Sequence, residues 1–114
     1  MTLDPVATNP DHYSVVFQND VVRVLQYEDA PGDRTTPHDH PNSVMITQSG
    51  FRRRLTSPTG SRDVELPSGA VVWLSAQQHF GENIGETPTR VLLVELLTSQ
   101  DHGGSDLGPS LPQD

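Results

Sequence analysis

The sequence predicts an all-β protein with a single domain, built as a small barrel or sandwich. Short runs rich in β-branched, leucine and aromatic residues recur at near-regular spacing, with glycine, proline or asparagine between them. No segment combines a sustained period of 3.6 residues with helix caps, so little helix is expected. At 114 residues the chain can bury one modest core but not two.

The first two strands are expected at Ser14–Gln18 and Val21–Tyr27, because Asn19-Asp20 between them suits a turn. Turns that contain glycine or proline separate most of the later strands. Those strands are expected at Thr35–His40, Ser43–Ser49, Phe51–Thr56, Asp63–Leu66, Ala70–Ser75, Gln78–Ile84 and Arg90–Thr98.

The two ends of the chain differ in composition from the middle. Residues 1–13 are rich in aspartate, proline and asparagine, which predicts an N-terminal arm rather than a core element. Residues 99–114 hold glycine, proline, serine and aspartate with only two leucines, and such a segment buries too little apolar surface to offset the entropy of ordering. We therefore expect a barrel over residues 14–98 and a disordered acidic tail after it.

Composition excludes several classes of function. The chain has no cysteine, so disulfides, thiolate ligands and a cysteine nucleophile are excluded, and all seven basic residues are arginine, so no lysine can form a Schiff base. A formal charge of −8 argues against nucleic acid and anionic membranes as partners. No signal-like or membrane-length apolar segment is present, which predicts a cytoplasmic protein.

Three histidines are the main candidates for chemistry. His38 and His40 are two positions apart, so on a strand they lie on the same face, and His79 is on a strand that could lie opposite. Imidazole is a common ligand of Fe, Ni, Cu and Zn, and three convergent imidazoles leave positions open for water or substrate. The pattern predicts a metal site at these three residues.

The residues around these histidines resemble the cupin superfamily. Gly32 stands six residues before His38, and a strand that ends at Gly50 follows, as in the first cupin motif. His79-Phe80-Gly81-Glu82-Asn83 matches the second motif. The stretches NDVVRVLQYEDAPGD and RVLLVELL are most similar to small bacterial monocupins, among them proteins associated with β-alanine degradation. The resemblance implies a double-stranded β-helix barrel with an exposed sheet edge, and small cupins commonly form homodimers.

One departure from the cupin pattern changes the expected chemistry. Cupins usually carry a glutamate ligand after the second histidine, but here Ser43, Val44 or Met45 stands at that place. The resemblance then narrows to three-histidine cupins, some of which are non-haem iron dioxygenases, with Fe(II) favoured over Mn, Ni or Zn. A lyase or isomerase that uses the metal as a Lewis acid is the alternative, as is a non-catalytic small-molecule binder with a degenerate metal site.

Arginines are the candidates to hold a small organic acid as substrate, because the guanidinium group matches a carboxylate. Alternation places Arg53 on the face of its strand that Phe51 and Leu55 share, and an inward arginine needs a partner such as Glu95 or a ligand. Arg23 is the second candidate. Gln77 shares the face of His79 and is expected to project toward the metal as a hydrogen-bond donor.

Overall fold

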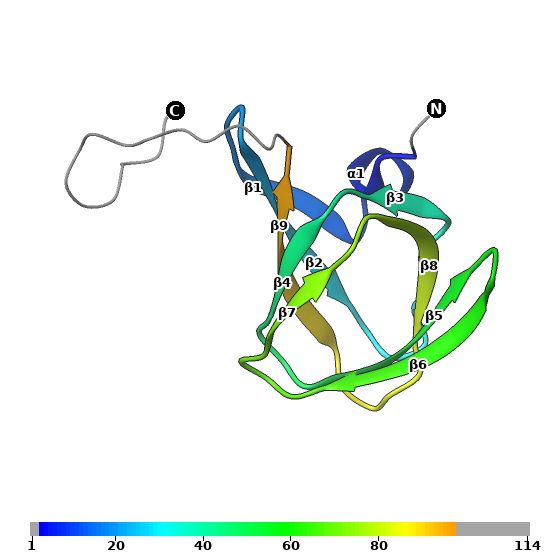
Figure 1. Ribbon diagram of the computed structural model, residues 1–114. Coiled ribbons are helices and arrows are strands. Elements are labelled where there is room, and N and C mark those ends of the chain that lie inside the picture. The colour runs from blue at the N-terminus through cyan, green and yellow to red at the C-terminus, as the bar shows by residue number, and fades with distance from the viewer. Residues whose placement is uncertain (1–2, 98–114) are drawn as a thin grey trace.

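The computed structural model describes residues 3–97, which form two antiparallel sheets that face each other as a barrel (Figure 1). The strand order is β1-β2-β9-β4-β7 in the five-stranded sheet and β3-β8-β5-β6 in the four-stranded sheet. The predicted all-β barrel is confirmed. The strands are β1 (Tyr13–Gln18), β2 (Val22–Asp29), β3 (His38–His40), β4 (Ser43–Thr47), β5 (Phe51–Ser57), β6 (Gly60–Leu66), β7 (Val71–Leu74), β8 (Gln77–Asn83) and β9 (Thr89–Leu96).

The core lies between the two sheets and is built by alternation along the strands. β2 and β9 pair over their full length, with Leu25 opposite Leu93 and Tyr27 opposite Val91, all four pointing inward. Tyr13 from β1 and Phe51 from β5 complete the buried apolar cluster. This cluster is small, so buried polar groups make up much of the interior.

Strand boundaries differ from the predicted ones by at most three residues, and several coincide. The largest loss is at the strand expected over Thr35–His40, which is reduced to β3. Thr36 leaves the ladder because its backbone N–H donates to the side chain of Asn9, although Thr35 N still donates to Gly81 O of β8. The predicted tail at 99–114 lies outside the described residues, and the predicted division of the chain into three parts stays a prediction.

The N-terminal segment corrects one expectation. A short helix, α1 (Pro5–Thr8), begins after Asp4, whose carboxylate accepts from Ala7 N, and proline stands at its first turn. The helix lies beside β3 in Figure 1, and Pro5 and Asn9 are buried. The segment therefore contributes buried residues beside β3, where the composition predicted no core element. Four residues are too few for a helical period to be seen in the sequence.

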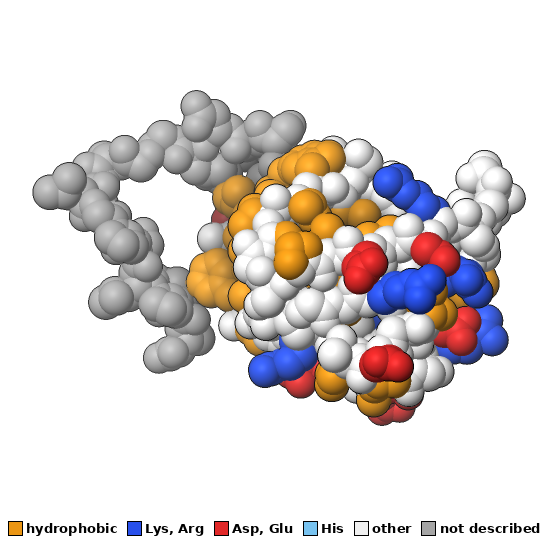
Figure 2. All heavy atoms as spheres, turned by 90° about the horizontal axis from the view of Figure 1, so that it is seen from below, with side chains coloured by type: hydrophobic (Ala, Val, Ile, Leu, Met, Phe, Trp, Pro, Cys, Tyr) orange, Lys and Arg blue, Asp and Glu red, His pale blue; other side chains and the backbone are white. Residues whose placement is uncertain are grey.

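The outer faces of the two sheets differ sharply. An unbroken apolar row crosses the five-stranded sheet, whereas charges alternate along the row Asp63–Arg54–Glu82–Arg34 outside the four-stranded sheet. In Figure 2 hydrophobic side chains are most frequent at the left and top of the view and charged ones at the right. The apolar row consists of Trp73, Val44, Val94, Val24 and Phe17, and is called here the outer apolar face. No helix among residues 3–97 is long and apolar enough to cross a membrane.

Candidate metal centre

Pairing of β3 with β8 brings the three predicted histidines together. His38 lies directly opposite His79, and His40 follows two residues later on the same face of β3. The three ring centroids are 4.8, 5.0 and 4.9 Å apart, which is a nearly equilateral triangle. All three side chains are buried, and one nitrogen of each lies within 4.8 Å of the other two. The group could bind a metal ion.

Hydrogen bonds fix which nitrogen of two of these rings is available. Nδ1 of His38 lies 2.7 Å from Thr36 O, and Nδ1 of His79 lies 2.6 Å from Gln77 Oε1. Both oxygens accept only, so each Nδ1 carries the proton and each Nε2 presents a lone pair. Gln77 thus contacts the outer side of His79. This differs from the sequence-based expectation, in which Gln77 projects toward the metal itself.

Burial keeps two of the imidazoles neutral. Burial, together with the positive charge of the neighbouring groups, lowers the pKa of His38 to about 4 and that of His79 to about 3. At neutral pH both rings are unprotonated at one nitrogen. A metal ion therefore displaces no proton from them when it binds.

Tyr13 is a site residue that the sequence analysis missed. Its hydroxyl oxygen lies 3.3 Å from His38 Nε2 and 3.5 Å from His40 Nε2, so it faces the same point as the histidines. Burial raises the pKa of Tyr13 well above its ordinary value, and the hydroxyl stays a hydrogen-bond donor. Tyr13 stands at the end of the segment expected as an arm. Its place directly before a β-branched run was the available signal.

The histidines lie in a mostly apolar cavity inside the barrel. A groove between the edge strands β6 and β7 reaches the same cavity and ends at His79. Arg62 and Gln77 line this groove, and Arg62 is on the inward-facing side of β6 with no ion pair among the described residues. The shared walls are Met45, Leu55, Val64, Leu66 and Leu74.

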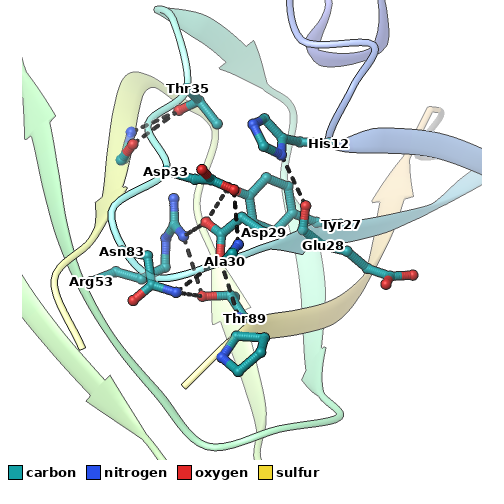
Figure 3. Close-up of polar contacts among 12 residues, drawn as sticks. His12, Tyr27, Glu28, Asp29, Ala30, Asp33, Thr35, Arg53, Asn83 and Thr89 are labelled. Atoms are coloured by element: carbon teal, nitrogen blue, oxygen red, sulfur yellow. Dashed lines mark hydrogen bonds and ion pairs between the residues drawn. The ribbon is translucent and has the colours of Figure 1, made fainter. Parts of the chain in front are cut away.

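Arg53 lines the cavity, as alternation predicts, but its partner is Asp29 of β2 and not Glu95. Figure 3 shows the side chains of Asn83 and Thr89 around the same carboxylate. The Tyr27 hydroxyl donates to Asp29 at 2.6 Å, Asn83 Nδ2 at 3.0 Å and Thr89 N at 3.2 Å. Burial alone would raise the pKa of Asp29, but these hydrogen bonds and the Arg53 charge hold it below its ordinary value.

Arg23 lies outside this cavity. Its Nε donates to Glu95 Oε1 at 2.7 Å, and its terminal nitrogen lies 2.5 Å from Asp4 Oδ1 at the start of α1. The structure therefore does not bring Arg23 to the position from which it could hold a substrate beside the histidines. Glu95, expected as a partner of Arg53, is instead the partner of Arg23 and lies on the outer side of His40.

Comparison with known proteins identifies the fold. No protein-family model matches the sequence, and no curated protein matches it significantly. Among solved structures, a cupin domain from Bordetella pertussis Tohama I is similar over 74% of this chain and 90% of its own, with a TM-score of 0.69 and 23% identity. A double-stranded β-helix protein from Klebsiella pneumoniae is similar over 76% of both chains, with a TM-score of 0.61 and 22% identity.

An enzyme is also among the similar structures. The polyketide cyclase RemF from Streptomyces resistomycificus matches with a TM-score of 0.58 and 18% identity, over 75% of this chain and 64% of its own. These likenesses confirm at the level of the fold the resemblance predicted from the two histidine motifs. The chain has the cupin fold, with a buried cluster of three histidines that could bind a metal ion.

Proposed function

We propose that the protein is a metal-dependent enzyme in which His38, His40 and His79 hold one divalent ion. Fe(II) is the favoured ion, with Mn, Ni or Zn as alternatives. The observation that carries the proposal is the arrangement of the rings, because His38 and His79 donate through Nδ1 to protein oxygens, which leaves each Nε2 free, and one nitrogen of each of the three rings lies within 4.8 Å of the other two. Metal-binding histidines are held in this way in many proteins.

The reaction proposed is dioxygenation of a small organic acid. Iron(II) supplies the electron transfer that makes O2 reactive toward an organic substrate. A carbon–carbon double bond of the substrate, as in an enol, breaks and both atoms of O2 enter the two new carbonyl groups. The substrate supplies all four electrons, so no separate reductant is needed.

Residues of the chain prepare the cavity for such a substrate. Neutral histidines leave the ion its full charge, which favours an anionic substrate group. The apolar walls exclude water and strengthen attraction between opposite charges. Arg62 at the groove and Arg53 in the cavity are the cations placed to attract a carboxylate, although Arg53 already has Asp29 as its partner.

Metal content and oxygen consumption test this function together. Purified protein should contain about one transition metal ion per chain, and iron-loaded protein should consume O2 when an enolisable carboxylic acid is added. His79→Ala should lose both metal and turnover, whereas His12→Ala, a histidine outside the cavity, should keep both. Protein that takes up no metal, or a His79→Ala variant that keeps its metal, would contradict the proposal.

The fold likeness to a polyketide cyclase favours one further candidate. In a lyase or isomerase, the metal would act as a Lewis acid on a substrate oxygen, with no change of redox state. The product would then form at the same rate without O2, and Zn would support turnover as well as Fe(II). A non-catalytic binder with a degenerate metal site, the remaining candidate, would take up little or no metal and release its ligand unchanged.

We also propose that the protein forms a homodimer through the outer apolar face. This row of Trp73, Val44, Val94, Val24 and Phe17 carries no charge, so two chains of formal charge −8 can meet there with little repulsion. Light scattering on protein eluted from a size-exclusion column should give a molecular mass of twice 12.5 kDa. Trp73→Glu should give monomers and Thr59→Glu, in the β5–β6 turn, should not. A monomeric wild-type protein would contradict this.

A further inference from the structure

Glu95 is the unusual residue of the barrel interior. Its side chain is only 1% exposed, and its Oε2 has no hydrogen-bond partner. The other buried side-chain atom without a partner among the described residues is His40 Nδ1. These two atoms lie 3.6 Å apart, just beyond hydrogen-bond distance. An unpaired buried carboxylate oxygen and an unpaired buried ring nitrogen are costly, so their juxtaposition calls for a reason.

We propose that Glu95 is a positioning residue for the metal centre, accepting the Nδ1 proton of His40 so that Nε2 of that ring is free to bind the ion. His38 and His79 already have such acceptors in Thr36 O and Gln77 Oε1. With Glu95 the third histidine gains one as well, and it is the only one of the three acceptors that carries a charge. The inference rests on the proposed metal-dependent function.

The position of Glu95 relates to the carboxylate missing from the first histidine motif. Ser43 is one of the three positions at which that glutamate is expected, and in the register of β4 and β9 Ser43 lies directly opposite Glu95. Ser43 is fully buried, and its hydroxyl donates to Pro41 O and so is turned to the backbone. A carboxylate is thus present at the same level of the barrel, one strand away. There it reaches the outer side of His40 and not the point that the three rings face.

Arg23 holds the Glu95 carboxylate in place. Its Nε donates to Glu95 Oε1 at 2.7 Å, which leaves Oε2 directed at His40. Asp4 in turn binds the end of the guanidinium group. The pair is within the barrel wall, where low solvent exposure strengthens the interaction. A carboxylate hydrogen-bonded to a metal-binding imidazole makes that ring more electron-rich, and losing such a partner typically lowers metal affinity about 10- to 100-fold.

The test compares Glu95→Gln with Glu28→Gln, which removes the same charge from an exposed position on the same sheet. Cobalt(II) serves as the probe, and its affinity is measured by competition with a chromophoric chelator. Glu95→Gln should bind Co(II) about 10- to 100-fold more weakly and shift the visible absorption bands, and Glu95→Asp should recover part of the affinity. Glu28→Gln should match the wild-type protein in both readouts.

Three results would overturn the inference. Glu95→Gln could bind Co(II) with wild-type affinity and spectrum, which would make Glu95 structural only. X-ray absorption could show one fewer oxygen ligand in that variant, which would make Glu95 a direct ligand. Wild-type protein could fail to bind Co(II) at all, in which case the proposed function fails first.

A measurement on the wild-type protein covers the case in which Glu95→Gln does not fold. Nitrogen-15 spectra of the histidine rings in the zinc-loaded protein report which nitrogen of each ring carries the proton. The inference requires a proton on His40 Nδ1, hydrogen-bonded to a carboxylate, and Nε2 bound to the ion. A proton on His40 Nε2 would overturn it.

Discussion

Two carboxylates of the five-stranded sheet, Asp29 and Glu95, face the four-stranded sheet across the barrel in opposite states. Asp29 meets Arg53 and accepts further hydrogen bonds from Tyr27, Asn83 and Thr89, so the cluster is complete without any ligand. Glu95 meets His40 and leaves one oxygen unsatisfied. A buried polar cluster thus serves stability where its bonds are all made, and is a candidate for binding where one is missing.

Breaking the complete cluster around Asp29 and Arg53 should cause the greatest loss of stability. Asp29→Asn leaves the Arg53 cation buried without its counter-charge, which should lower the free energy of unfolding by about 3–5 kcal/mol. Urea unfolding followed by circular dichroism measures this. Asp63→Asn, which breaks the exposed pair with Arg54, should leave the midpoint unchanged. Equal losses in both variants would show that burial does not distinguish the two pairs.

Acid should remove the contribution of the same carboxylate. The pKa of Asp29 is lower in the folded than in the unfolded chain, where it is near 3.9, so its contribution is present above that value and is lost as the pH falls below it. The difference in unfolding free energy between wild type and Asp29→Asn should therefore shrink as the pH falls from about 5 to about 3. Contributions from the buried histidines are shared by both proteins and cancel. A difference that is constant with pH would contradict this assignment.

A smaller effect is expected from crowding Arg53. A Cβ atom added at Gly81 would lie 2.5 Å from one terminal nitrogen of Arg53 and 3.2 Å from Leu55, so the guanidinium group, whose other terminal nitrogen binds Asp29, must shift. Gly81→Ala should cost about 1–3 kcal/mol in unfolding free energy. Gly50→Ala is the control, because its nearest neighbour would be at 3.7 Å, which is ordinary contact. Loss of stability in Gly50→Ala of the same size would point to backbone effects instead.

Alternation along the strands made one side of each buried cluster predictable from the sequence: the arginine that meets Asp29, and the histidines beside Glu95. It placed Arg53 on the inner face with Phe51, and His38 with His40 on one face of β3. The strand period of two residues is sufficient for such statements, because it fixes the face without knowledge of the neighbouring strand.

The partners across the barrel could not be predicted in the same way. Asp29 and Glu95 are on β2 and β9, and which inward residues meet depends on the order and register of strands far apart in the chain. Glu95 was therefore expected as a partner of Arg53, although it pairs with Arg23. Tyr13 was missed for a related reason, because only the pairing of β1 with β2 brings it into the barrel.

Asp4, at the outer end of the Glu95 cluster, should contribute least to stability and to metal affinity. Asp4→Asn removes the charge that faces Arg23 but keeps a side chain suited to the start of α1. This pair is partly exposed, so the cost in unfolding free energy should stay below about 1 kcal/mol. Because Arg23 still holds Glu95, Co(II) affinity should change by less than about threefold, well under the change for Glu95→Gln. If Asp4→Asn and Glu95→Gln lost Co(II) affinity equally, the orientation of His40 would depend on the whole chain of ion pairs from Asp4 through Arg23 to Glu95 and not on Glu95 alone.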